Sequence, residues 1–157
     1  MNTVDAPSLL ADDKEYLWHP YSSTHSDTPI FAVQSARGVT LQLEDGRELI
    51  DGMASWWCAI HGYNVPELNR AASTQLEQMA HVMFGGLTHR PAVELGRKLV
   101  DITPDGLDTV FLADSGSVSV EIALKMAVQY WQANGRPGKQ RFVSLRGGYH
   151  GDTLGAM

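Results

Sequence analysis

Between residues 109 and 145 the sequence changes from strand-like to helical and back to strand-like. An apolar run at residues 109–113 stops at the polar segment DSGS (residues 114–117), and a helical pattern then extends to about residue 134. Residues 141–145 form a second strand-like run. A strand, a helix and a strand in this order imply parallel strands joined by a right-handed crossover. The sequence therefore predicts an α/β fold.

An antiparallel hairpin is predicted earlier in the chain. Residues 31–57 alternate apolar and polar side chains, and Val39, Leu41 and Leu43 fall on one face. The dipeptide Asp45-Gly46 separates two such runs, which is a strong hairpin signal. We therefore expect a small antiparallel unit here.

Two amphipathic helices are predicted between the hairpin and the first strand-like run. Asn64 can cap the first helix, and Pro66 suits its first turn. The second helix restarts with Pro91, and leucines recur at helical spacing in both. We expect residues 1–60 to form an N-terminal segment with the hairpin, and residues 61–157 to begin a larger domain.

Composition and charge exclude several classes of protein. The formal net charge is −6 without any basic cluster, which disfavours nucleic-acid binding. Cys58 is the single cysteine, so no internal disulfide can form and a reducing compartment is expected. The irregular first 28 residues lack the pattern of a signal peptide, and no apolar run reaches the length of a membrane span. We therefore expect a cytoplasmic protein.

Neither a metal site nor a catalytic lysine is predicted. The sequence has no H-E-x-x-H motif and no Cys/His ligand spacing. The lysines lie in polar or helix-surface contexts, unlike a desolvated Schiff-base lysine. The sequence stops in the glycine-rich segment RGGYHGDTLGAM, directly after a strand-like run. We therefore expect the chain to be the N-terminal part of a longer protein.

The DSGS segment has the features of an anion site. The first N–H groups of a helix lack internal partners and carry the positive end of the helix dipole. Gly116 lets a ligand approach the backbone, and Ser115 and Ser117 add hydroxyl groups. The alternative is that Ser115 or Ser117 is only a helix N-cap. Spacing alone leaves both interpretations open.

Two aromatic segments are further candidates. Tyr149 lies in the glycine-rich loop RGGYHGD after the second strand-like run, where it could stack on a planar ring or belong to a surface turn. By topology this loop and DSGS lie at the same edge of the sheet. Trp56 and Trp57 would point in opposite directions on an extended chain, so that one could line a cavity, or both could be core residues.

Five motifs follow one another between about Tyr16 and Met157: WHPY, DGMASWWCAIHGYN, HVMFGGLTH, VFLADSGSVSVEIALKMA and YHGDTLGAM. In this order they resemble the motifs of class III pyridoxal-phosphate aminotransferases. The paired tryptophans, with WHPY and IHGYN, most resemble the members that act in biotin synthesis. The short departures, Ala54, Cys58 and Val65, do not fall on the expected contacts.

The resemblance implies the N-terminal part of a fold-type I pyridoxal-phosphate-dependent transferase and assigns roles to residues. It implies that Gly116 and Ser117 bind the cofactor phosphate and that Tyr149 lies against the pyridoxal ring. It also implies that Tyr21 and Trp56, with Tyr149, line the substrate pocket. The FGGLTH segment implies a homodimer. No role follows for Asp152.

The implied reaction is a transamination from S-adenosylmethionine to 8-amino-7-oxononanoate, giving 7,8-diaminononanoate. The resemblance places the Schiff-base lysine beyond Met157, so we expect this chain alone to be inactive. One alternative is another class III aminotransferase that uses an ω-amino acid or diamine donor. A second alternative is a non-catalytic fragment that keeps the surface of the fold.

Overall fold

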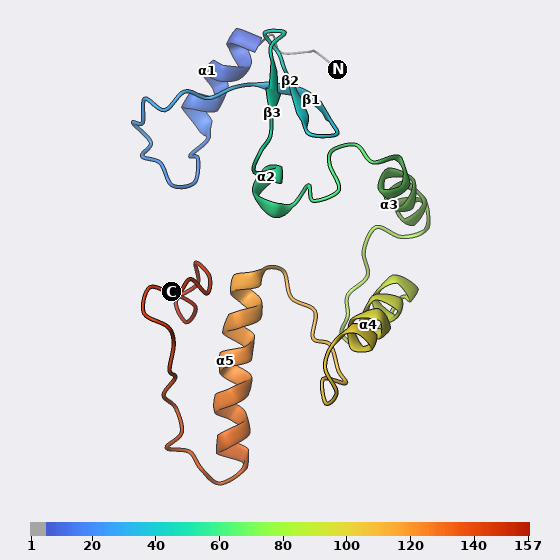
Figure 1. Cartoon of the computed structure of the whole chain (residues 1–157), viewed down its shortest axis with the longest axis vertical. Helices are drawn as coiled ribbons and strands as arrows, with labels where there is room; N and C mark the ends of the chain where they lie inside the picture. Colours follow the sequence, from blue (N-terminus) through green and yellow to red (C-terminus); the bar gives the residue numbers. More distant parts are fainter. Residues whose placement is uncertain (1–5) are drawn as a thin grey trace. The chain divides into compact units, whose positions relative to one another are not determined.

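The computed structural model describes residues 6–157 (Figure 1). It contains two compact units, one extending to Val82 and the other spanning Met83–Met157. This division follows the compactness of the two parts and does not test the domain boundary expected at residue 60. That boundary stays a prediction.

A three-stranded antiparallel sheet forms the regular part of the first unit. Strands β2 and β3 pair across the turn at Asp45-Gly46, where Gly46 has a φ of 87° that favours glycine. The hairpin prediction is therefore confirmed. Leu43 is only 2% exposed, whereas Val39 lies outside the strands and is 59% exposed. The strand order is β1-β2-β3, with bounds Val33–Arg37, Thr40–Leu43 and Glu48–Ile50.

Helix α1 (Ala6–Tyr16) precedes the sheet. The expectation of irregular structure over the first 28 residues is therefore wrong for this segment, and for residues 1–5 it lies outside the described chain. The segment contains two leucines, two alanines, one lysine and one glutamate, which are good helix formers. The sequence pattern did not indicate this helix, because its apolar residues do not recur along one helical face.

Helix α3 (Pro66–Gln78) begins with a proline in its first turn, as expected. The N-cap is Val65, without a side-chain cap, so the prediction that Asn64 caps the helix is wrong. Asn64 has a φ of 56°, and its Oδ1 accepts a hydrogen bond from Asn69 Nδ2 at 2.6 Å. The asparagine therefore braces the preceding turn.

Two long helices dominate the second unit. Helix α4 (Arg90–Ile102) has Pro91 in its first turn, and the His89 ring accepts a hydrogen bond from the Ala92 N–H. Helix α5 (Gly116–Ala133) ends at the cap residue Asn134 and is followed by a glycine with a φ of 71°. The predicted helix after DSGS is therefore confirmed.

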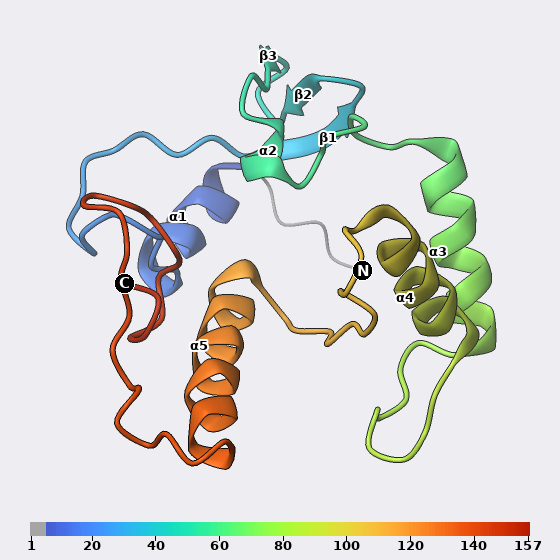
Figure 2. The same ribbon diagram turned by 60° about the horizontal axis from the view of Figure 1, so that its bottom comes forward.

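The segments that flank α5 differ from the expectation. Residues 109–113 and 141–145 form no β-ladder, so the expected parallel pair between them is absent from the described chain. A strand requires a hydrogen-bonded neighbour, and consecutive strands are adjacent in only about two-thirds of cases. The error was to infer adjacency from order along the chain. Residues 141–145 still run back beside α5 towards its N-terminal end (Figures 1 and 2).

Most apolar side chains of the described residues remain accessible. The buried ones are Leu43, Ala92 and Ala156, whereas Met126 and Tyr130 of α5 are about half exposed. Such extensive apolar surface is typical of faces that pack against further protein. No helix within residues 6–157 combines the length and apolarity needed to cross a bilayer.

Candidate functional site

The N-terminus of α5 presents two backbone amides. Ser115 is extended, and its Oγ accepts a hydrogen bond from the Val118 N–H at 3.2 Å, so its interpretation as the N-cap is confirmed. In the described part of the chain, no hydrogen bond uses the N–H groups of Gly116 or Ser117. A Cβ built on Gly116 meets no heavy atom within 4 Å. Capping by Ser115 therefore leaves two amides and an open approach to them.

We expect Ser115→Ala to destabilise the start of α5 by about 1 kcal/mol, because the substitution removes the side-chain acceptor for the Val118 N–H. Faster hydrogen exchange in the first turn of α5 would show this. Ser119→Ala is the matched control, since Ser119 Oγ only donates to the Ser115 carbonyl oxygen. Equal exchange in both variants would contradict the capping role.

The glycine-rich loop before Met157 folds back on the first turn of α5. The Asp152 N–H donates to Ser117 Oγ at 3.0 Å. Gly151 has a φ of 142°, and a Cβ there would lie 2.6 Å from the same Oγ atom. The two loops, expected at one edge of a parallel sheet, therefore do lie together, although the described chain forms no such sheet between them.

A carboxylate one turn further along α5 fixes the end of this loop. Glu121 Oε2 accepts hydrogen bonds from Thr153 Oγ1 and from the Gly155 N–H, both at 2.9 Å. Sequence reasoning missed Glu121. Its spacing of four residues from Ser117 places both side chains on one face of the helix, and this signal could have identified it.

Tyr149 extends from the loop, and the residue is 75% exposed. Its hydroxyl donates to Asp152 Oδ2 at 2.9 Å, which gives Asp152 a contact that the sequence did not assign. Because the Asp152 backbone also donates to Ser117, one residue links the tyrosine to the α5 terminus. The structure thus brings Gly116, Ser117 and Tyr149 into one local arrangement.

Tyr21 and Trp56 meet within the first unit. Their ring centroids are 5.3 Å apart with planes tilted by 35°. Trp56 and Trp57 lie in α2 (Ala54–Trp57), where both residues have positive φ. The expectation of opposite orientations on an extended chain is therefore wrong. Left-handed backbone costs about 1–2 kcal/mol per non-glycine residue, a cost that strand-like alternation in the sequence does not reveal.

The Asp51 carboxylate lies beside this turn. Hydrogen bonds from the Tyr63 hydroxyl and from the Met53 and Ser55 N–H groups lower the pKa of Asp51 below its ordinary value. The same carboxylate raises the pKa of Tyr63. Asp51 is therefore ionised at neutral pH, and Tyr63 stays protonated as its hydrogen-bond donor.

We expect the turn around Trp56 to loosen in acid. The pKa of Asp51 is lower in the folded protein than its ordinary value of 3.8. The charged carboxylate therefore stabilises the turn fully at pH values above 3.8, and this stabilisation is lost as the pH falls through the pKa of the folded state. Near-UV circular dichroism of the tryptophans should change in that range. Asp51→Asn should lack the step. A step of equal size in the variant would assign it to another carboxyl group.

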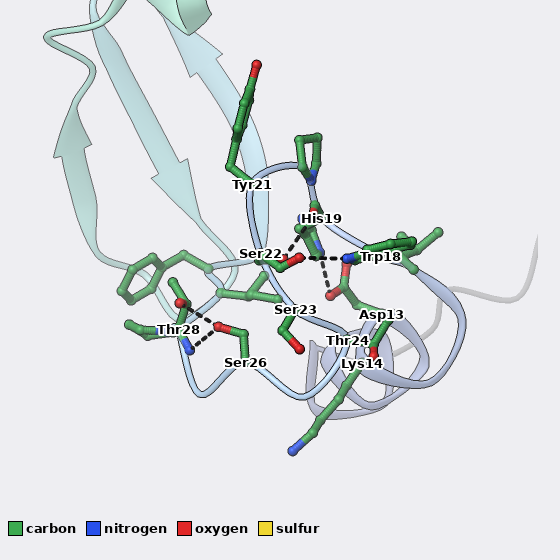
Figure 3. Close-up of a pocket in the computed structure, with 15 residues that line it drawn as sticks. Asp13, Lys14, Trp18, His19, Tyr21, Ser22, Ser23, Thr24, Ser26 and Thr28 are labelled. Carbon is green, nitrogen blue, oxygen red and sulfur yellow. Dashed lines mark hydrogen bonds and ion pairs between the residues drawn. The ribbon is translucent and has the colours of Figure 1, made fainter. Parts of the chain in front are cut away.

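A concavity of about 460 Å³ has Tyr21 among its lining residues (Figure 3). Its wall is fixed by the His19–Asp13 contact at 2.9 Å and by the Trp18 indole N–H, which donates to the Ser22 carbonyl oxygen at 2.8 Å.

Within residues 6–157 no group of three or more histidine, cysteine, aspartate or glutamate side chains could hold a metal ion.

Comparison with known proteins gives a consistent result. Residues 21–157 match the model of the class III aminotransferases. The adenosylmethionine-8-amino-7-oxononanoate aminotransferase of Buchnera aphidicola subsp. Acyrthosiphon pisum is 56% identical over 145 residues, which cover 92% of this chain and 34% of the relative. The chain thus spans about a third of the length of the curated relatives it matches.

Solved structures show the same backbone. The crystal structure of adenosylmethionine-8-amino-7-oxononanoate aminotransferase from Methanocaldococcus jannaschii matches with a TM-score of 0.92 and 37% identity, over 97% of this chain and 35% of that one. The omega transaminase from Pseudomonas jessenii, in complex with PMP, matches with a TM-score of 0.87 and 31% identity. That match covers 94% of this chain and 33% of the transaminase.

Proposed function

Because the chain belongs to the class III aminotransferase family, we propose that the complete polypeptide carrying it is a pyridoxal-phosphate-dependent aminotransferase. The observation that carries this proposal is the docking of the RGGYHGD loop on the first turn of α5. The loop carries the aromatic side chain of Tyr149 and contacts the N-terminus of α5, where two backbone amides are available.

The residues of the second unit fit the cofactor. The N–H groups of Gly116 and Ser117 bind the phosphate, whose charge the positive end of α5 favours. Gly116 has no side chain, so the phosphate can reach the backbone. Tyr149 packs against the pyridoxal ring and is oriented by Asp152. When bound, the cofactor supplies an electron sink for amino-group transfer, while this chain binds and orients it.

Tyr21 and Trp56 line the substrate pocket in this proposal. Their rings, tilted by 35° to each other, together form an apolar surface suited to the alkyl part of a substrate. No lysine of this chain is given a catalytic role.

We propose S-adenosylmethionine as the amino donor and 8-amino-7-oxononanoate as the acceptor, so that the product is 7,8-diaminononanoate of biotin synthesis. The support is the 56% identity to a relative with that name. We also propose a cytoplasmic homodimer. The FGGLTH segment supports the dimer, and the exposed thiol of Cys58 suits a reducing compartment.

An assay of the complete polypeptide with S-adenosylmethionine as sole donor tests this proposal. Turnover of 8-amino-7-oxononanoate under these conditions is expected. The rival is a class III aminotransferase acting on ω-amino acids or diamines, which the similarity to the Pseudomonas jessenii omega transaminase favours. Turnover with such donors and none with S-adenosylmethionine would support the rival. Absence of turnover with any donor, in a preparation loaded with pyridoxal phosphate, would favour a non-catalytic role.

A further inference from the structure

The left-handed backbone of the first unit is concentrated around one pair of aromatic rings. Among the described residues, all non-glycine positions with positive φ lie in this unit, and four of them are consecutive in α2. Strained backbone persists only where surrounding contacts over-determine it. The strained positions are Tyr21, Ala54, Ser55, Trp56, Trp57 and Asn64.

The Asp51 carboxylate binds one backbone amide just before the left-handed turn and one within it. Asp51 Oδ1 accepts a hydrogen bond from the Met53 N–H at 2.9 Å, and Oδ2 accepts one from the Ser55 N–H at 2.6 Å. The Ser55 amide directly precedes Trp56, so the carboxylate acts where the orientation of the indole is set. Hydrogen bonds to a charged acceptor are stronger than those between neutral groups.

The carboxylate itself is anchored to the hairpin. The Tyr63 hydroxyl donates to Asp51 Oδ2 at 2.5 Å. The Tyr63 backbone exchanges two hydrogen bonds with Gly38, at 2.7 and 3.1 Å, and the Asp51 N–H donates to the Val39 carbonyl oxygen at 2.8 Å. Asp51 and Tyr63 are therefore both tied to the turn between β1 and β2.

We propose that Asp51 is a positioning residue, whose carboxylate, braced by Tyr63, holds the left-handed turn that directs Trp56 against Tyr21. It thereby shapes the pocket wall that selects the substrate. This inference rests on the proposed function, in which Tyr21 and Trp56 line the pocket. Asp51 contacts neither ring in this role and acts only through the backbone of the turn.

Fluorine NMR of the complete polypeptide labelled with 5-fluorotryptophan tests the positioning directly. Asp51→Asn should shift the Trp56 and Trp57 resonances, which Trp56→Phe and Trp57→Phe assign. The resonance of Trp131, which lies in α5 of the second unit, should stay in place. Tyr63→Phe removes the hydroxyl that donates to Asp51 but keeps the carboxylate, and should give a smaller shift of the same sign. Asp45→Asn is the control, since Asp45 pairs with Arg47 in the hairpin.

Kinetics of the same variants test the consequence for the substrate. Asp51→Asn and Tyr63→Phe should raise KM for the amino acceptor about tenfold or less with little change in kcat, as expected for loss of uniform binding. If Asp51→Asn unfolds, Tyr63→Phe decides alone. A Trp56 resonance that stays in place, or equal shifts of all tryptophan resonances, overturns the positioning role. A Trp56 shift with unchanged KM leaves positioning intact but overturns the proposed pocket.

Discussion

Gly116→Val should weaken pyridoxal phosphate binding by the complete polypeptide about tenfold to a hundredfold. Hydrogen bonds to a charged group contribute about 1.5–3 kcal/mol each, and the valine side chain would stand between the phosphate and the amides that make them. The fold should tolerate the change, because a Cβ at this position meets no neighbour within 4 Å. Titration of the apo-protein with pyridoxal phosphate, followed by absorbance, measures the effect.

Gly138→Val is the matched control. Gly138 lies in the same unit and follows α5, its φ is not positive, and a Cβ added there also meets no heavy atom within 4 Å. Its variant should keep the affinity of the parent protein. Equal affinities in both variants would remove the helix terminus from the cofactor site. Equal losses in both would indicate general damage to the fold.

Gly151→Ala should detach the RGGYHGD loop from α5. The added Cβ would lie 2.6 Å from Ser117 Oγ and 2.7 Å from Ser117 Cα. Overpacking of this kind costs about 1–3 kcal/mol, and the φ of 142° adds backbone strain. Hydrogen exchange of the Asp152 amide should accelerate, because its bond to Ser117 is lost.

Gly147→Ala is the control that separates the steric clash with Ser117 from the strain of placing alanine at a positive φ. Gly147 also has a positive φ, of 71°, but a Cβ there meets nothing within 4 Å. This variant should show only the conformational cost of about 1–2 kcal/mol and keep the Asp152 amide protected. Fast exchange of that amide in both variants would mean that the loop does not depend on contact between Gly151 and Ser117.

The sequence predicted the elements whose signals are local. The Asp45-Gly46 turn and the prolines Pro66 and Pro91 in first helical turns act through nearby backbone, and each is found where expected. The closeness of DSGS and the glycine-rich loop was expected from sheet topology, and the contact is found although the described residues form no such sheet.

Features that depend on distant partners were not predictable. The left-handed turn at Trp56 is held by Asp51 and by Tyr63, which lies twelve residues further along the chain than Asp51. Its sequence alternates like a strand, so the pattern indicated extended backbone. The pairing of residues 109–113 failed as a prediction for a related reason, since a ladder partner is a property of the whole sheet.

The bonds that join the RGGYHGD loop to α5 link residues about 35 positions apart, by the Asp152–Ser117 and Gly155–Glu121 contacts. The entropic cost of closing such a segment grows only slowly with its length, so the intervening helix can be long without preventing the contact. The hydrogen bonds that fasten the loop therefore come from one contiguous stretch of chain, between Ser117 and Gly155.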